Sequence, residues 1–114
     1  MIMNIRELIS NKCIKDNYED IKLSHPGVYL TEKDSGLRFY LRIDIMSPNR
    51  DLLDGLVFLI NGTDSRVLGR FANSTVEQIS EYISQQSYKF LRFYDSTKSL
   101  TEIIREVFHD GKGS

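Results

Sequence analysis

The feature that most constrains this fold is a ten-residue stretch, Leu37 to Met46, in which apolar and polar side chains alternate. Alternation with a period of two is typical of a β-strand that has one buried face and one solvated face. Strands buried on both faces have uninterrupted apolar runs instead, so the pattern favours an antiparallel sheet that helices cover on one side only. The residues expected to face the core are Leu37, Phe39, Leu41, Ile43 and Ile45.

Three more strands are predicted around this stretch. Val28 to Glu32 forms a hairpin with it through the turn residues Lys33 to Gly36. Leu56 to Ile60 is uninterrupted and apolar, which indicates a central strand partly covered on both faces. Arg66 to Phe71 then returns after the turn residues Asn61 and Gly62.

The signals in two other segments are weaker. Ile14 to Gly27 is largely polar and contains His25-Pro26, so a loop is predicted there. Tyr88 to Tyr94 is rich in aromatic residues and is predicted to be a fifth strand. A helix would connect it to the fourth strand, which would allow it to run parallel to a neighbour.

Three amphipathic helices are predicted, from about Ile5 to Lys12, from about Thr75 to Gln86, and after Ser99. Each begins with a capping residue that is followed three positions later by glutamate or glutamine, the pattern of a capping box. The predicted caps are Asn4 for the first helix, Ser74 or Thr75 for the second and Ser99 for the third. Apolar side chains at helical spacing follow each cap. These apolar stripes need a common surface, and the apolar face of the sheet is the only one that is large enough.

The predicted fold is therefore an α+β two-layer sandwich in the order α-β-β-β-β-α-β-α. It has a mainly antiparallel five-stranded sheet with three helices packed on one face. The chain has 114 residues, which is enough for one hydrophobic core. We expect a single domain over residues 1–110, followed by a flexible tail at 111–114.

Composition argues against several functional classes. Fifteen basic and sixteen acidic residues give a net charge of −1, which provides no overall attraction to nucleic acid or to an anionic membrane. A single cysteine, Cys13, no signal sequence and no apolar run of roughly 20 residues indicate a cytoplasmic protein. His25 and His109 have no partners at metal-ligand spacing. We therefore expect no metal, no cofactor and no enzymatic activity.

The solvated face of the alternating strand is the candidate binding surface. Arginine and tyrosine are enriched at the energetic centres of protein interfaces, and they can also stack on bases and contact phosphates. Alternatively, such side chains only stabilise a solvated sheet face across strands. A second surface, the acidic helix faces with Glu77 and Glu102, is most simply a solvated one. The candidate partner-binding residues are Arg38, Tyr40, Arg42, Arg66, Arg70, Arg92 and Tyr94.

The expected function is that of a small protein-binding module. In general character the chain is similar to bacterial immunity proteins and antitoxins, which neutralise a toxin by covering it, and a protein such as a toxin domain is the expected partner. Two alternatives stay open. One is a nucleic-acid-binding protein that uses the Arg and Tyr face, which the near-neutral charge disfavours, and the other is a small-ligand-binding domain.

Overall fold

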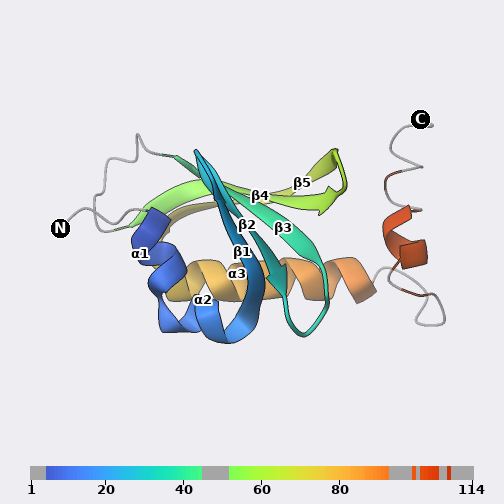
Figure 1. The fold of residues 1–114 in the computed structure, drawn as a ribbon, viewed down its shortest axis with the longest axis horizontal. Helices are drawn as coiled ribbons and strands as arrows, with labels where there is room; N and C mark the ends of the chain where they lie inside the picture. Colours follow the sequence, from blue (N-terminus) through green and yellow to red (C-terminus); the bar gives the residue numbers. More distant parts are fainter. Residues whose placement is uncertain (1–4, 45–51, 93–98, 100, 106–107, 109–114) are drawn as a thin grey trace.

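A computed structural model describes residues 5–44, 52–92, 99, 101–105 and 108 of the chain (Figure 1). It confirms the α+β fold, with a five-stranded sheet and four helices in the described ranges. The elements are α1 (Ile5–Ser10), α2 (Lys12–Asn17), β1 (Tyr18–Ser24), β2 (Gly27–Glu32), β3 (Arg38–Asp44), β4 (Leu53–Asn61), β5 (Asp64–Ser74) and α3 (Val76–Arg92), followed by a short helix at 101–105.

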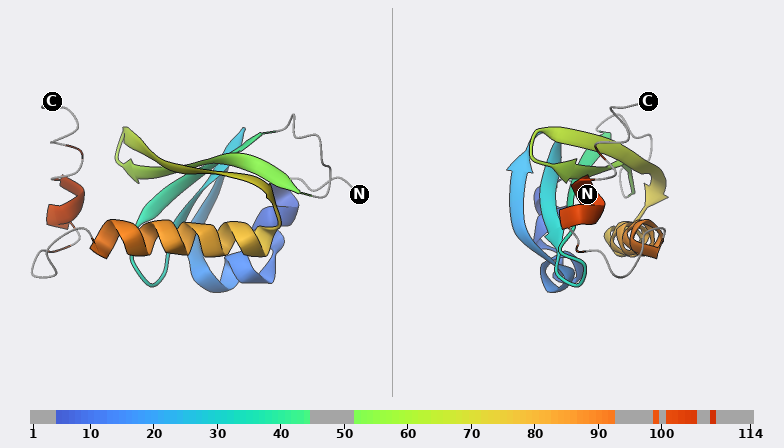
Figure 2. Two further views of the ribbon diagram at one scale, coloured as in Figure 1. Left: turned by 180° about the vertical axis from the view of Figure 1, so that it is seen from behind. Right: turned by 90° about the vertical axis from the view of Figure 1, so that its right-hand side faces the viewer.

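The strands follow one another through the sheet in the order β1-β2-β3-β4-β5, and every neighbouring pair is antiparallel. The sheet is strongly curved, and α3 lies across its concave side with α1 and α2 beside one end of α3 (Figure 2). The helix at 101–105 lies near the opposite end of α3 (Figure 1). All the described helices thus lie on the concave side or at its ends.

The core lies between the concave side of the sheet and the helices. Leu37, Phe39, Leu41 and Ile43 are buried there, as the alternation predicts, while Ile45 lies outside the described residues. The other strands and the helices contribute the remaining members of this cluster, which are Leu8, Ile14, Tyr18, Val28, Leu30, Leu53, Val57, Leu59, Phe71, Val76, Ile79, Ile83 and Phe108.

The fifth strand is β1 and not the predicted Tyr88 to Tyr94 segment. The prediction of a loop from Ile14 to Gly27 was wrong, because α2 ends at Asn17 and β1 follows at once. A register shift between Glu19 and Lys22, together with a positive φ of 50° at Asp20, interrupts the alternation in β1. A bulge of this kind is common in edge strands and hides the period of two on which strand prediction depends.

Helix α3 continues to Arg92 and occupies the residues predicted to form the fifth strand up to that point. The buried side of α3 continues through this part of the helix. It includes Ser87, which is 2% exposed, and Phe90 and Leu91, which pack against the core. A small serine at a core position concealed the helical period in the sequence. The last part of the predicted strand, residues 93–94, lies outside the described residues.

Helix caps agree with the sequence patterns where the structure describes them. Thr75 and Gln78 form a reciprocal capping box at the start of α3, with N···O distances of 2.9 and 3.2 Å. The Ser99 side chain accepts a hydrogen bond from the Glu102 N–H at 3.2 Å. The predicted cap at Asn4 lies outside the described residues, and the first predicted helix is divided in two at Asn11, whose side chain caps α2.

A buried polar cluster connects the sheet to α3. The Glu32 carboxylate is 6% exposed and accepts hydrogen bonds from the hydroxyl groups of Ser35 and Ser84 at 2.7 and 2.8 Å. The Tyr18 hydroxyl donates to the Ser80 carbonyl at 3.1 Å. Because polar groups away from water are stable only when they are hydrogen-bonded, these contacts fix the position of α3 against β1 and β2.

Candidate functional site

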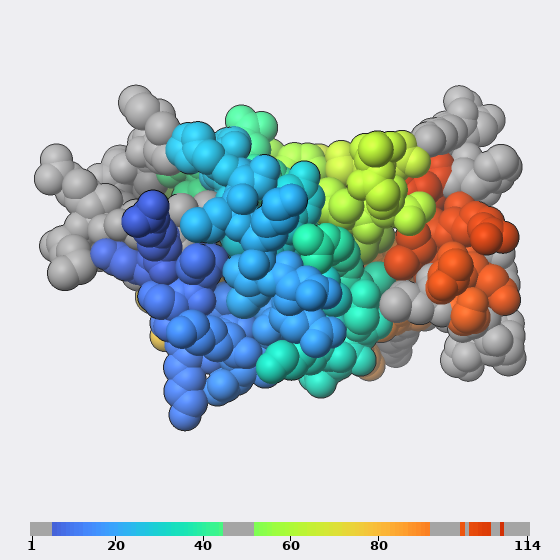
Figure 3. All heavy atoms as spheres, in the orientation of Figure 1, coloured from blue at the N-terminus to red at the C-terminus, as the bar shows by residue number. Residues whose placement is uncertain are grey.

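The candidate site is the convex side of the sheet, called here the outer face. In the space-filling view, the atoms of β1 to β3 and of the β4–β5 hairpin lie at the surface with no helix over them (Figure 3). Strand pairing places side chains from β2, β3, β4 and β5 on this face in rows across the strands. Its members are Tyr29, Thr31, Arg38, Tyr40, Arg42, Asp44, Asp54, Leu56, Phe58, Ile60, Val67 and Arg70.

An aromatic row crosses the middle of the outer face. Tyr40 is directly opposite Tyr29 on one side and Phe58 on the other. Ring centroids are 4.6 Å apart in the first pair and 6.2 Å apart in the second, and both pairs are tilted. These separations are within the range of favourable aromatic contacts. Val67, which is opposite Phe58 and 54% exposed, extends the row onto β5.

Arg38 is held against the sheet by several contacts. Its guanidinium carbon is 5.4 Å from the centroid of the Tyr29 ring. The same side chain donates to Thr31 Oγ1 at 2.9 Å and to the Asp20 carbonyl at 3.4 Å. A cation over an aromatic ring is attracted by the negative face of that ring. Arg38 therefore has a structural role in addition to its place on the outer face.

Tyr40 reaches over β2 to the end of β1. Its hydroxyl donates to the Ser24 carbonyl at 2.7 Å, and its ring covers Gly27. Desolvation, with a smaller contribution from Tyr29, raises the pKa of Tyr40, so its hydroxyl keeps its proton and remains a donor. The aromatic row is thereby anchored on Tyr40.

Replacement of Gly27 by alanine is expected to destabilise the fold and displace Tyr40. A Cβ at this position would overlap the Leu41 carbonyl oxygen and lie 2.7 Å from the Tyr40 ring. Overpacking of this kind costs about 1–3 kcal/mol. Urea denaturation measures the loss, and Gly62→Ala is a useful comparison because a Cβ there meets nothing within 4 Å, although its φ of +64° adds backbone strain. Unchanged stability and an unchanged Tyr40 environment in Gly27→Ala would contradict the described packing.

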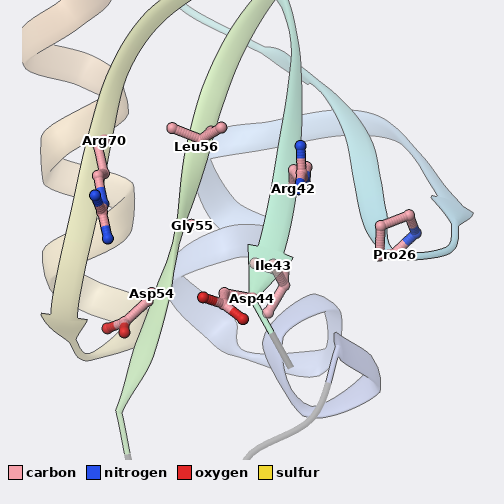
Figure 4. Close-up of a pocket in the computed structure, with 8 residues that line it drawn as sticks. All are labelled: Pro26, Arg42, Ile43, Asp44, Asp54, Gly55, Leu56 and Arg70. Atoms are coloured by element: carbon pink, nitrogen blue, oxygen red, sulfur yellow. The ribbon is translucent and has the colours of Figure 1, made fainter. Parts of the chain in front are cut away.

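A basic row lies next to the aromatic row. Leu56 is directly opposite Arg42 on β3 and Arg70 on β5, so the two arginines flank it (Figure 4). Both arginines are exposed. Within the part of the chain that the structure describes, neither guanidinium has a hydrogen bond or an ion pair with a neighbouring side chain. The pair lines a hollow of about 350 Å³.

An acidic row follows at the same end of the face. Asp44 and Asp54 are directly opposite each other, and both line the same hollow (Figure 4). Asp54 Oδ1 accepts a hydrogen bond from the Asn73 N–H at 2.7 Å. Three rows of different character, acidic, basic and aromatic, thus succeed one another along the strands.

A second hollow, of about 500 Å³, lies beside the aromatic row. Its walls are Tyr29, Tyr40, Phe58 and Ile60, together with Arg42 and the 62–65 turn region of the β4–β5 hairpin. The aromatic and apolar side chains give this hollow a largely apolar lining, and the guanidinium of Arg42 adds a positive charge to it. Such a shape suits an apolar or aromatic side chain that a partner inserts.

The structure brings together four of the seven predicted site residues, which are Arg38, Tyr40, Arg42 and Arg70. Arg66 is not among them, because it pairs with the buried Leu59 and so belongs to the opposite face. Val57 pairs with Gly69 and Phe58 with Val67, so β5 has one extra residue at this point. Because of this register shift, the side chains of Arg66 and Arg70 point to opposite faces of the sheet. The backbone of Arg92 belongs to α3 on the concave side, and Tyr94 lies outside the described residues.

Several members of the outer face were not among the predicted binding residues, notably Tyr29, Leu56, Phe58 and Ile60. The apolar run in β4 was predicted to be partly covered on both faces, and Leu56, Phe58 and Ile60 are indeed half-buried, although no described helix lies over this face of the sheet. Neighbouring side chains on the sheet itself provide their partial burial. The predicted hairpin could have identified Tyr29, because it places this residue opposite Tyr40. The β4 residues depend on the pairing of β3 with β4, which no tight turn determines in the sequence.

Comparisons with protein-family models, with curated proteins and with solved structures each return no match. In the described residues, no group of three or more His, Cys, Asp or Glu side chains could hold a metal ion. None of the helices in those same ranges combines the length and apolar character needed to cross a membrane. Function is therefore inferred from the outer face.

Proposed function

We propose that this protein is a protein-binding module that acts by covering a partner with the outer face of its sheet. The observation that carries this proposal is the row of Tyr29, Tyr40 and Phe58 on a sheet face that no described helix covers. Large aromatic side chains beside arginine are the commonest anchors of protein interfaces, because they offer a large contact area with few torsions to immobilise.

The mode of action that we favour is steric inhibition, in which the outer face blocks the active site or binding face of a toxin. Immunity proteins and antitoxins act in this way. Inhibition by occlusion requires only a rigid surface with anchors and suitable charge, and the curved antiparallel sheet backed by α3 provides the rigid support. The partner is then a protein, and the complex requires no chemistry from this chain.

The size of the outer face limits how the partner binds. The acidic, basic and aromatic rows are followed by a fourth that contains Thr31 and Arg38. Four strands at about 4.8 Å spacing and four rows at about 6.8 Å spacing give roughly 300–500 Å². A stable interface covers about 800 Å² on each partner. The partner is therefore expected to extend beyond the rows, onto the β4–β5 hairpin or onto the β2 side of the sheet.

The double substitution Tyr29→Ser and Phe58→Ser is expected to abolish recovery of the partner. Two lost aromatic anchors reduce affinity by roughly 700-fold, since each is expected to contribute on the order of 2 kcal/mol and about 1.4 kcal/mol corresponds to a factor of ten. The measurement is affinity purification of the tagged chain from its native host, followed by quantification of the stoichiometric partner.

The matched control is Tyr88→Ser, which removes an aromatic side chain that is 64% exposed on α3. This control should recover as much partner as the unmodified chain, and thermal denaturation should show that both variants remain folded. Recovery of the partner by the double variant would contradict the proposal, and so would repeated recovery of the unmodified chain with no protein bound.

A further inference from the structure

We infer that the partner inserts an acidic side chain between Arg42 and Arg70. This inference rests on the proposed function, because it specifies the chemistry of the partner at the outer face. It starts from the basic row, in which Leu56 separates the two arginines (Figure 4).

The spacing of the arginines suits a shared anion. Two strand separations place the Cα atoms of Arg42 and Arg70 about 10 Å apart. Each guanidinium is at the end of a long side chain. In Figure 4 the Arg70 side chain lies along β5 on the side of Asp54, so convergence of both groups over Leu56 requires a change in its side-chain torsions on binding. A carboxylate accepts paired hydrogen bonds from guanidinium groups, in a geometry that the ammonium of lysine does not reproduce.

Both guanidinium groups are available for such a contact. Arg38, on the same face, is held by Tyr29 and Thr31, whereas Arg42 and Arg70 have no hydrogen bond or ion pair among the described residues. The hollow of about 350 Å³ that they line is large enough for a side-chain carboxylate, and Asp44 and Asp54 line the part of it nearer the acidic row. The half-buried Leu56 between them lowers the local polarity and strengthens the attraction between opposite charges.

The acidic row favours a protein partner over a nucleic acid. Asp44 and Asp54 lie one row from the arginines, at a separation of about 6.8 Å along the strands. A polyanion bound at the basic row would place further phosphates near these carboxylates, and like charges in an interface cost affinity. A single carboxylate held between the two guanidinium groups brings one negative charge near these carboxylates, whereas a polyanion brings several.

The test uses a phage-displayed library of random 12-residue peptides as the probe, selected against the immobilised full chain. We expect enriched peptides to contain aspartate or glutamate together with an apolar anchor. The strongest peptide should bind Arg42→Gln/Arg70→Gln at least tenfold more weakly, as measured by fluorescence polarisation. The matched control is Arg66→Gln, an exposed arginine on the opposite face, which should change the affinity by less than twofold.

A double-mutant cycle distinguishes direct contact from an indirect effect on folding. Replacement of the acidic residue of the peptide by its amide should cost tenfold against the unmodified chain and less than twofold against Arg42→Gln/Arg70→Gln. Additive losses would overturn the inference. So would enriched peptides that lack acidic residues, or a labelled 12-nucleotide RNA that binds the chain through the same two arginines.

The outcomes also separate this inference from the proposed function. Peptides that require Tyr29 and Phe58 but are indifferent to Arg42 and Arg70 would overturn the acidic anchor and leave the protein-binding outer face supported. Peptides that require none of the four residues, or a library that yields no binder, would contradict both.

Discussion

Replacement of Phe39 by alanine is expected to lower the free energy of unfolding by about 3–5 kcal/mol. Phe39 is fully buried in β3, the middle strand of the sheet, and is directly opposite Leu30 on β2 and Leu59 on β4. Both of these neighbours are fully buried as well, so they cannot move to fill the space that the ring leaves. The loss therefore includes both the transfer free energy of the ring and the cost of a cavity.

The matched control for this prediction is Phe58→Ala. Phe58 is on the adjacent strand but on the outer face, where it is half-buried, so its removal leaves no closed cavity. Urea denaturation of the two variants should show a clearly larger loss for Phe39→Ala, at an unchanged dependence on urea concentration. Equal losses would mean that the two faces of the sheet are wrongly assigned.

Stability is expected to fall as the pH rises from about 10 to about 12, because of Tyr18. Burial raises the pKa of Tyr18 from its ordinary value of 10.0 to about 12, and the negative charge of Glu32 adds to the effect. Between these two values the unfolded chain loses the phenol proton and the folded chain keeps it. The unfolded state then binds fewer protons, so the free energy of unfolding decreases with pH, by roughly 2–3 kcal/mol in all.

Comparison with Tyr18→Phe isolates this contribution from the other groups that titrate at high pH. At pH 8 the variant should be less stable by about 1–3 kcal/mol, because the buried Ser80 carbonyl loses its donor. This difference should shrink toward pH 12, since the variant has no phenol to ionise at this position. Tyr88→Phe, which alters an exposed ring on α3, is the control that should keep the pH dependence. A difference that stays constant with pH would contradict the burial of Tyr18.

Several parts of this fold could be predicted from local sequence. The alternation in β3 identified its buried face, and the turn before it identified the β2–β3 hairpin. The capping pattern at Ser74 or Thr75 located the start of α3 to within one residue, and the structure shows the box of Thr75 and Gln78. These features depend on residues only a few positions apart, where backbone geometry alone determines which side chains share a face or reach a free N–H.

Other parts depended on bulges and packing that leave little local signal. β1 lost its alternation at the bulge near Asp20, and α3 continued beyond its predicted end because Ser87 is buried at a core position. In both cases tertiary contacts outweighed the local pattern, since partner strands and the core accept residues that the pattern alone would place in a loop or at a helix end.

The sequence by itself therefore determined that Arg38, Tyr40 and Arg42 share one face of a strand. Only the tertiary structure decided which residues of the neighbouring strands lie beside them, because the register between strands determines which residues are opposite each other. One register shift in β5 put Arg66 on the opposite face and left Arg70 facing Leu56 and Arg42. The division of the outer face into acidic, basic and aromatic rows follows from that register.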